Sequence, residues 1–193
     1  QQLFDRLCAD FEKVVVLLNV CGPVATAQFR DNPAVGAILY PMFGGDGAGQ
    51  VICDLLSGKC YPSGHLQDTL ADRIEDYPST ANFAQYRDHV DYEEDIFVGY
   101  RYFETFAPEK AVYPFGFGLS YTDFSLECTG VEIRGSEILV QAKVTNTGDR
   151  YAGKEVAQLY VSAPNGQLHK EYQSLAAFAK TDLLSPGESQ TLL

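Results

Sequence analysis

The stretch that decides the fold is residues 91–122, DYEEDIFVGYRYFETFAPEKAVYPFGFGLSYT. It brings aromatic rings, carboxylates and glycines together, and it follows neither the 3.6-residue period of a helix nor the alternation of a strand. A segment of this composition has little reason to form plain hydrophobic core. We therefore interpret it as a shaped connection between two folding units.

The irregular sequence extends back to Lys59, and its composition argues against a solvated linker. Residues 61–122 hold 14 of the chain's 24 aromatic residues and eleven carboxylates. Irregular segments of this length are usually functional or wrap another surface. Rings that cover a sugar face, beside carboxylates that accept hydrogen bonds from hydroxyls, would suit a carbohydrate. Alternatively, the rings pin the segment to neighbouring domains and the acids face water.

The N-terminal side has the pattern of an α/β domain. Apolar residues at helical spacing predict a helix over residues 2–12, and the apolar run VVVLLNV predicts a buried parallel strand over residues 14–20. A second strand is expected over residues 35–40. The glycine-rich residues 44–49 then open a helix that runs to about Ser57, where Gly58 is well placed to end it.

The glycine loop raises the question of phosphate or dinucleotide binding, which uses free N–H groups at a helix N-terminus. No GK[ST] follows the loop, the spacing misses GxGxxG, and no acidic residue ends a following strand. A tight turn at the carboxyl edge of the sheet explains the glycines better. Ligands of α/β folds bind at that edge, so Asp46 is kept as a candidate ligand contact.

The C-terminal side has the pattern of an all-β sandwich. Strands are expected over residues 138–144, 155–162, 174–180 and 189–193, separated by turn sequences at residues 146–149, 163–166 and 185–188. This spacing is typical of an immunoglobulin or fibronectin III-like sandwich. Since a complete unit has about 100 residues, we expect its final strands to lie outside this chain.

The predicted organisation is therefore a partial parallel-sheet α/β sandwich domain followed by an all-β immunoglobulin or fibronectin III-like sandwich. We place the α/β region at residues 1–66, an aromatic-rich connector at residues 67–122 and the truncated fibronectin-like region at residues 123–193.

Composition narrows the classes of partner. The net charge of −12 repels nucleic acid and anionic lipid, and no apolar run is long enough to span a membrane. The three histidines are far apart and unpaired with cysteines, so we predict no metal site and no cofactor. The five cysteines form no CxxC pair; we expect buried free thiols, which favour a reducing, cytoplasmic compartment.

Four motifs occur in a fixed order: residues 61–66 (YPSGHL), residues 94–103 (EDIFVGYRYF), residues 113–121 (YPFGFGLSY), and residues 144–149 (VTNTGD) with 152–156 (AGKEV). Together they resemble the NPSGKL, EGIFVGYRYF, YPFGFGLSY and VTNTGxxAGKEV motifs of glycoside hydrolase family 3, the last from its fibronectin type III-like domain. Residues 66–69 and 75–83 are similar to a bacterial branch, some of whose members carry a permuted domain order. The resemblance therefore leaves open on which side the barrel lies.

The resemblance implies a retaining exo-β-glycosidase, chiefly a β-glucosidase. Retaining hydrolysis uses two carboxyl groups about 5–5.5 Å apart, a nucleophile and an acid/base. In the family the nucleophile is an Asp of a (β/α)8 barrel, which is not in this chain. The acid/base is typically a Glu that we expect to precede Gln1. No catalytic residue is therefore assigned here, and the implied partners are a β-linked oligosaccharide or glycoside and the missing barrel.

Four residues are carried as substrate-binding or interdomain candidates: Asp46, Glu94, Tyr100 and Arg101. Glu94 and Arg101 keep the family's residue types. Two departures stand beside them, since Asp95 occupies a position where the family usually has glycine, and Asp46 lies one place before the acid of the family's EGG-type loop.

We predict an accessory portion of a β-glucosidase-like enzyme, inactive by itself, that shapes and supports the active site. The alternative from another class is a non-catalytic carbohydrate-binding or adhesion module. A nucleotide-binding α/β domain would depend on the glycine loop alone.

Overall fold

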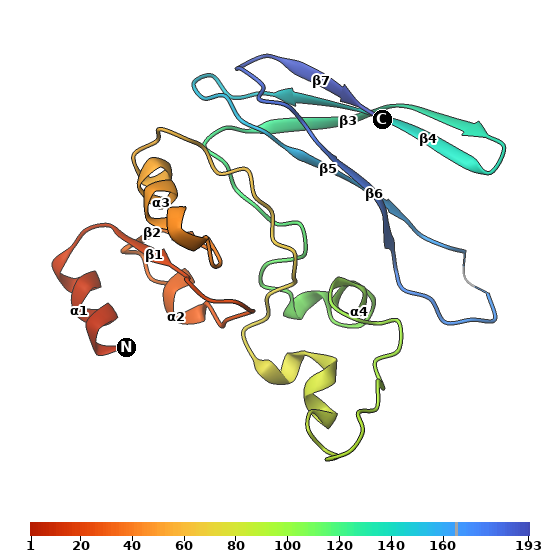
Figure 1. The fold of residues 1–193 in the computed structure, drawn as a ribbon, viewed down its shortest axis with the longest axis horizontal. Helices are drawn as coiled ribbons and strands as arrows, with labels where there is room; N and C mark the ends of the chain where they lie inside the picture. The colour runs from red at the N-terminus through yellow and green to blue at the C-terminus, as the bar shows by residue number, and fades with distance from the viewer. Residues whose placement is uncertain (165) are drawn as a thin grey trace.

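A computed structural model describes residues 1–164 and 166–193 of the chain (Figure 1). The helices and the parallel strand pair of the α/β region lie together at one end, and the antiparallel strands of the fibronectin-like region lie together at another. The connector, drawn yellow to green, runs between the two and carries its own short helices.

The α/β region contains α1 (Gln2–Asp10), β1 (Val14–Leu17), α2 (Ala27–Arg30), β2 (Val35–Leu39) and α3 (Ala48–Leu56). The prediction of two parallel strands is confirmed, because β1 and β2 pair in parallel. The prediction of a continuously buried strand over residues 14–20 is wrong. The strand ends at Leu17, and Val15 and Leu17 are 43% and 42% exposed, since neighbouring side chains point to opposite faces of the sheet.

The glycine loop forms a tight turn before α3. Gly45 adopts a φ of +64°, and the 3-10 turn η1 (Gly45–Gly47) leads directly into the helix. At the other end Gly58 has a φ of +72°, and the Lys59 N–H donates to the Asp54 carbonyl at 2.9 Å. This left-handed glycine ends α3, as predicted.

Two antiparallel segments form the base of the connector: residues 112–118 and residues 65–71, which begin just before it. Leu70 and Tyr113 form an antiparallel bridge, and the Leu66 N–H donates to the Phe117 carbonyl at 2.8 Å. Its helices are η2 (Ile74–Asp76), η3 (Pro78–Asn82), α4 (Tyr100–Phe106) and η4 (Pro108–Lys110). This pairing brings the end of the YPSGHL motif against the YPFGFGLSY motif.

Most of the fully buried apolar residues lie in the connector: Leu70, Ala71, Phe103 and Ala107. The Phe103 ring is 1% exposed and meets the Tyr77 ring edge to face at 5.5 Å. The Tyr77 hydroxyl accepts from the Ala71 N–H at 2.9 Å. The connector therefore has a core of its own.

The fibronectin-like region has a three-stranded and a two-stranded antiparallel sheet. Strands β3 (Phe124–Arg134), β4 (Glu137–Asn146) and β7 (Ser189–Leu192) form one, in the order β3-β4-β7, and β5 (Val156–Val161) pairs with β6 (Ser174–Lys180) in the other. The turn at residues 185–188 is confirmed by a bond from the Glu188 N–H to the Ser185 carbonyl. The turn expected at residues 163–166 includes Asn165, which lies outside the described residues.

The centre of this region is a buried polar residue, Asn146, with no exposed surface. Its Nδ2 donates to the carbonyls of Tyr151 and Leu184, both at 2.9 Å, and its Oδ1 accepts from the Thr122 hydroxyl at 2.6 Å and from the Gly148 N–H at 3.1 Å. The asparagine of the VTNTG motif is therefore explained by folding, because its side chain ties the loop that follows it to Thr122 and Leu184.

The expectation of buried thiols is wrong. All five cysteines are free, but Cys21, Cys53 and Cys128 are exposed, and Cys8 and Cys60 are half-buried. A cytoplasmic location loses this support and stays a prediction. Among the described residues, no helix has the length and apolar character to cross a bilayer, and no group of three or more His, Cys, Asp or Glu side chains could hold a metal ion.

Candidate functional site at the interdomain seam

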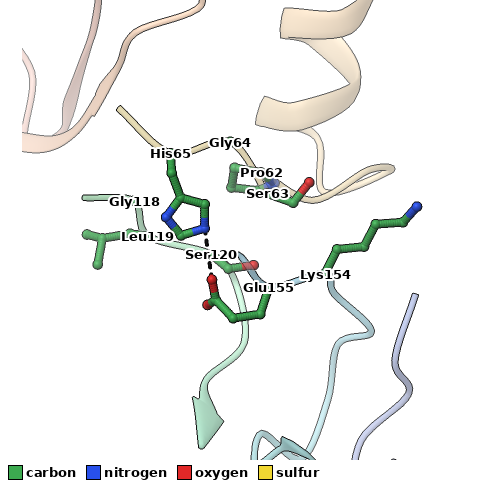
Figure 2. A pocket seen from close by; sticks show the side chains of 9 residues that line it. All are labelled: Pro62, Ser63, Gly64, His65, Gly118, Leu119, Ser120, Lys154 and Glu155. Carbon is green, nitrogen blue, oxygen red and sulfur yellow. Dashed lines mark ion pairs between the residues drawn. The ribbon is translucent and has the colours of Figure 1, made fainter. Parts of the chain in front are cut away.

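The seam between the fibronectin-like region and the rest of the chain is centred on His65 and Glu155 (Figure 2). His65 lies in the loop of residues 62–66, and Glu155 lies just before β5. The His65 Nε2 is 2.8 Å from Glu155 Oε1, and the His65 Nδ1 is 2.8 Å from the Gly116 carbonyl oxygen. One side chain therefore contacts both the connector and the fibronectin-like region.

Each partner favours the charged form of the other. The hydrogen bond to Glu155 raises the pKa of His65, against the opposing effect of burial. Burial favours the neutral form of Glu155, but the His65 hydrogen bond and the Val156 N–H together lower the pKa of its carboxyl. The side chains are 18% and 25% exposed, so water screens this pair less than a surface pair.

A lysine and a glycine complete this part of the seam. Lys180 Nζ, at the end of β6, donates to the Ser63 carbonyl at 2.6 Å and contacts the Ser63 hydroxyl at 3.0 Å. A Cβ placed on Gly118 would lie 2.5 Å from the Gly64 carbonyl oxygen and 3.0 Å from the His65 Nδ1. The second glycine of the FGFG sequence is needed because two backbones meet here.

A second part of the seam joins α4 to β6 and the residues before it. The Leu175 N–H donates to the Tyr100 hydroxyl at 2.8 Å, and the Tyr172 N–H donates to the Thr105 hydroxyl at 2.9 Å. Gln173 Nε2 donates to the Glu104 carboxylate at 2.7 Å. Three successive hydrogen bonds therefore fix one edge of the fibronectin-like region on α4.

The connector is also tied to the α/β region. Arg30 of α2 donates to both oxygens of Asp72, at 3.2 and 3.0 Å. The Arg30 hydrogen bond, assisted by backbone N–H groups at residues 26 and 27, lowers the pKa of Asp72. The Tyr121 hydroxyl donates to the Leu55 carbonyl at 2.9 Å.

The four predicted site residues divide into two pairs. Tyr100 and Arg101 lie on α4 at the seam. The Tyr100 ring stacks on Phe115 at 4.9 Å and meets Tyr160 of β5 at 6.0 Å. The Arg101 guanidinium is 5.8 Å from the Tyr100 ring centre, and its buried Nε has no hydrogen-bond partner among the described residues.

Asp46 and Glu94 do not join them. Asp46 is exposed on η1, and Glu94 is half-buried in the loop before α4. Neither side chain makes a hydrogen bond or an ion pair within the described part of the chain. Asp95, at the departure from the family's glycine, has a φ of +49°, a conformation in which glycine is unstrained.

His65 and Glu155 were not predicted as site residues, although they lie in the YPSGHL and AGKEV motifs. The available signal was His65 itself, which stands where the similar motif has lysine. Its partner could not be predicted from the sequence, because the whole connector separates Glu155 from His65 along the chain.

Two hollows lie along this seam. The first, about 10 Å³, is lined by His65, Glu155 and Ser120 and has room for about one water molecule. The second, about 250 Å³, opens between Tyr61, Lys59 and Lys154. Glu155 is the one carboxylate in the lining of either, and it is bound to His65. Neither of these two hollows therefore contains the pair of free carboxyl groups that retaining glycoside hydrolysis uses.

Comparison with known proteins gives the family. Residues 1–121 match the glycosyl hydrolase family 3 C-terminal domain, and residues 155–193 match a fibronectin type III-like domain. The chain belongs to glycoside hydrolase family 3. The resemblance seen in the four motifs and the expected fold class are both confirmed, whereas the three boundaries drawn from the sequence stay predictions.

The similar proteins are β-glucosidases. The chain is 46% identical to β-glucosidase A of Butyrivibrio fibrisolvens over 94% of its own length, and 45% identical to a β-glucosidase of Ruminococcus albus over 95%. A crystal structure of a β-glucosidase from Paenibacillus barengoltzii matches 98% of the chain with a TM-score of 0.94 and 47% identity. β-Glucosidase 3B of Thermotoga neapolitana, solved in complex with glucose, matches 99% with a TM-score of 0.91 and 41% identity.

This family 3 chain spans only part of these relatives. It covers 24% and 19% of the two curated β-glucosidases, and 21% and 27% of the two solved chains. The relatives are thus much larger proteins that contain further parts.

Proposed function

We propose that this chain is an accessory portion of a retaining exo-β-glycosidase that hydrolyses terminal β-linked sugars, with a β-glucoside as the substrate class. In this proposal the catalytic nucleophile and acid/base belong to parts of the enzyme outside the chain, including a (β/α)8 barrel. The observation that carries it is the match of nearly the whole chain to about a fifth of each β-glucosidase relative.

The chemistry of the seam supports the accessory role. A general acid in a glycosidase needs a carboxyl group whose pKa is raised. Glu155 has the opposite environment, because its pKa is lowered and His65 already occupies its Oε1. A residue of this kind orients protein segments rather than transferring a proton to a leaving group.

The contacts of the seam indicate how support is given. Tyr100 and Thr105 of α4 hold the start of β6 and the residue Tyr172 before it. At the other end of β6, the loop of residues 62–66 is bonded to the fibronectin-like region through the His65–Glu155 and Ser63–Lys180 contacts. The fibronectin-like region is thereby held at two separated points. Such rigid placement is what an active site assembled from several domains requires, because catalytic groups must be positioned accurately.

The test compares this 193-residue chain with the full-length protein that contains it, on an aryl β-glucoside. We expect turnover by the full-length protein and none by the chain alone. Turnover by the chain would refute the accessory role, and an inactive full-length protein would remove the glycosidase assignment.

Sugar binding by the isolated chain separates the proposal from the alternative of a carbohydrate-binding or adhesion module. Titration with glucose and cellobiose, followed by NMR chemical shifts, is expected to leave the chain's spectrum unchanged. Saturable shifts without turnover would favour the binding module instead.

A further inference from the structure

The two nitrogens of the His65 ring both face oxygen acceptors. Nδ1 faces the Gly116 carbonyl and Nε2 faces the Glu155 carboxylate, each at 2.8 Å. A neutral imidazole carries one N–H, so it can donate to only one of these oxygens and turns a lone pair toward the other. The imidazolium donates to both. The observed arrangement therefore fits the charged ring and no neutral tautomer.

We propose that His65 is a pH-dependent latch that, when protonated, ties the loop of residues 62–66 and the Gly116 backbone to Glu155 of the fibronectin-like region, and that loosens this seam when it loses its proton. This concerns contacts inside the chain, so it holds whether or not the full-length protein hydrolyses β-glucosides.

The surroundings restrict where else the ring could go. Gly118 lies against the Gly64 carbonyl and the His65 ring so closely that one added Cβ would approach them within 2.5 and 3.0 Å. On its other side Glu155 is fixed by its own backbone, because Oε1 accepts from the Val156 N–H at 2.7 Å and the Glu155 N–H donates to the Thr181 hydroxyl at 3.0 Å. The close approach of Gly118 and the backbone contacts of Glu155 therefore restrict both halves of the latch.

The charged groups around the ring are Glu155, Lys180 and Lys154. Glu155 favours the protonated ring, and Lys180, bound to Ser63, opposes it. Lys154 lines the same hollow, and Figure 2 shows its side chain extending away from the ion pair. The direct hydrogen bond to Glu155, assisted by the Gly116 carbonyl, outweighs both burial and the charge of Lys180, which is why the pKa of His65 rises rather than falls.

The sign of the pH effect follows from the two shifts. Because the pKa of His65 is raised in the folded chain, its stabilisation is complete below its ordinary value of 6.5 and is lost as pH rises through the folded value. Because the pKa of Glu155 is lowered, its stabilisation is present above its ordinary value of 4.5 and is lost as pH falls through the folded value. The latch is therefore closed between about pH 4.5 and 6.5 and opens on the alkaline side.

The first measurement is an NMR titration of the His65 ring in the intact chain and in the same chain unfolded in urea. We expect a higher titration midpoint in the folded chain, and a midpoint that falls back in Glu155→Gln. Equal midpoints in the folded and unfolded wild-type chain would overturn the proposal, and that comparison does not depend on any variant folding.

The second measurement tests whether titration moves the seam. Hydrogen exchange of peptides covering residues 62–66 and 152–156, corrected for the intrinsic pH dependence of exchange, is expected to lose several-fold protection between pH 6 and pH 8.5. His65→Lys is the matched control, since lysine occupies this position in the similar motif and stays charged across that range. Protection that is independent of pH in the wild type, or that falls equally in His65→Lys, would overturn the latch.

Discussion

Residues 83–98 and residues 99–122 are adjacent in the connector and both contain many aromatic residues, yet their side chains differ in burial. In residues 83–98, which we call the open loop, all side chains except Glu94 and Phe97 are exposed, and the Phe83 and Tyr92 rings reach 82% and 79% exposure. In residues 99–122, Phe103 and Ala107 are 1% and 4% exposed.

Backbone pairing accounts for a large part of this difference, beside the higher content of acidic residues in residues 83–98. Residues 112–118 bond to residues 65–71 through the Leu66, Leu70, Val112 and Gly116 N–H groups, and the resulting pair gives α4 a surface on which to pack. The open loop has only short turns, such as the bond from the Phe97 N–H to the Glu94 carbonyl. Aromatic content alone therefore does not tell a core from an exposed surface.

The largest effect is expected when one aromatic ring is removed from each segment and the two losses of stability are compared. Phe103→Ala removes a fully buried ring and should lower the free energy of unfolding by about 3–5 kcal/mol. Phe83→Ala, in the open loop, should change it by less than about 0.5 kcal/mol. Urea unfolding followed by circular dichroism measures both. Similar losses in the two variants would show that the open loop is packed in solution.

A smaller effect is expected where two backbones meet. Gly118→Ala forces a Cβ to within 2.5 Å of the Gly64 carbonyl and should cost about 2–3 kcal/mol, because backbone cannot rotate aside as a side chain can. The matched control is Gly49→Ala in α3, where no atom lies within 4 Å of the new Cβ.

The control should stabilise the helix by up to about 1 kcal/mol, since alanine loses less backbone entropy than glycine. A Gly118→Ala chain as stable as the wild type would mean that residues 62–66 are not held against residues 116–118. That result would also weaken the case for the His65 latch.

The periodicity of apolar residues predicted most of the helices and strands. It failed where the alternation of apolar and polar residues is interrupted. Strand β3 was missed because a bulge between Cys128 and Gly130 shifts its register. Phe124, Leu126 and Cys128 alternate in one phase, and Val131 and Ile133 alternate in the other, so no single period covers the strand. Helix α4 was missed because aromatic residues, which are modest helix formers, make up most of it.

The candidate site was predictable only in part. Tyr100 and Arg101 lie at the seam, and their role as site residues stays a prediction. The hydrogen bond between Tyr100 and Leu175 of β6, and the position of the Arg101 charge relative to Glu171, depend on the docked fold. The pKa of Glu171 is lowered chiefly by its bond from the Ser174 hydroxyl and to a smaller extent by the charge of Arg101. His65 and Glu155 come into contact only in the folded chain, where the connector returns toward residues 62–66. A local sequence pattern therefore cannot predict their pairing.

The smallest effect is expected for Ala84→Gly, which tests whether the open loop forms an ordered turn in solution. Ala84 has a φ of +55°, a left-handed conformation that costs an L-residue about 1–2 kcal/mol. Ala84→Gly removes that strain and adds about 0.5–1 kcal/mol of backbone entropy to the unfolded chain, so we expect a net gain of about 0.5–1 kcal/mol in urea unfolding. Asp95→Gly, at a φ of +49°, should gain less, because aspartate tolerates this region better than alanine. If Ala84→Gly is no more stable than the wild type, the loop does not keep this conformation in solution. The contrast with residues 99–122 would then be one of order as well as of burial.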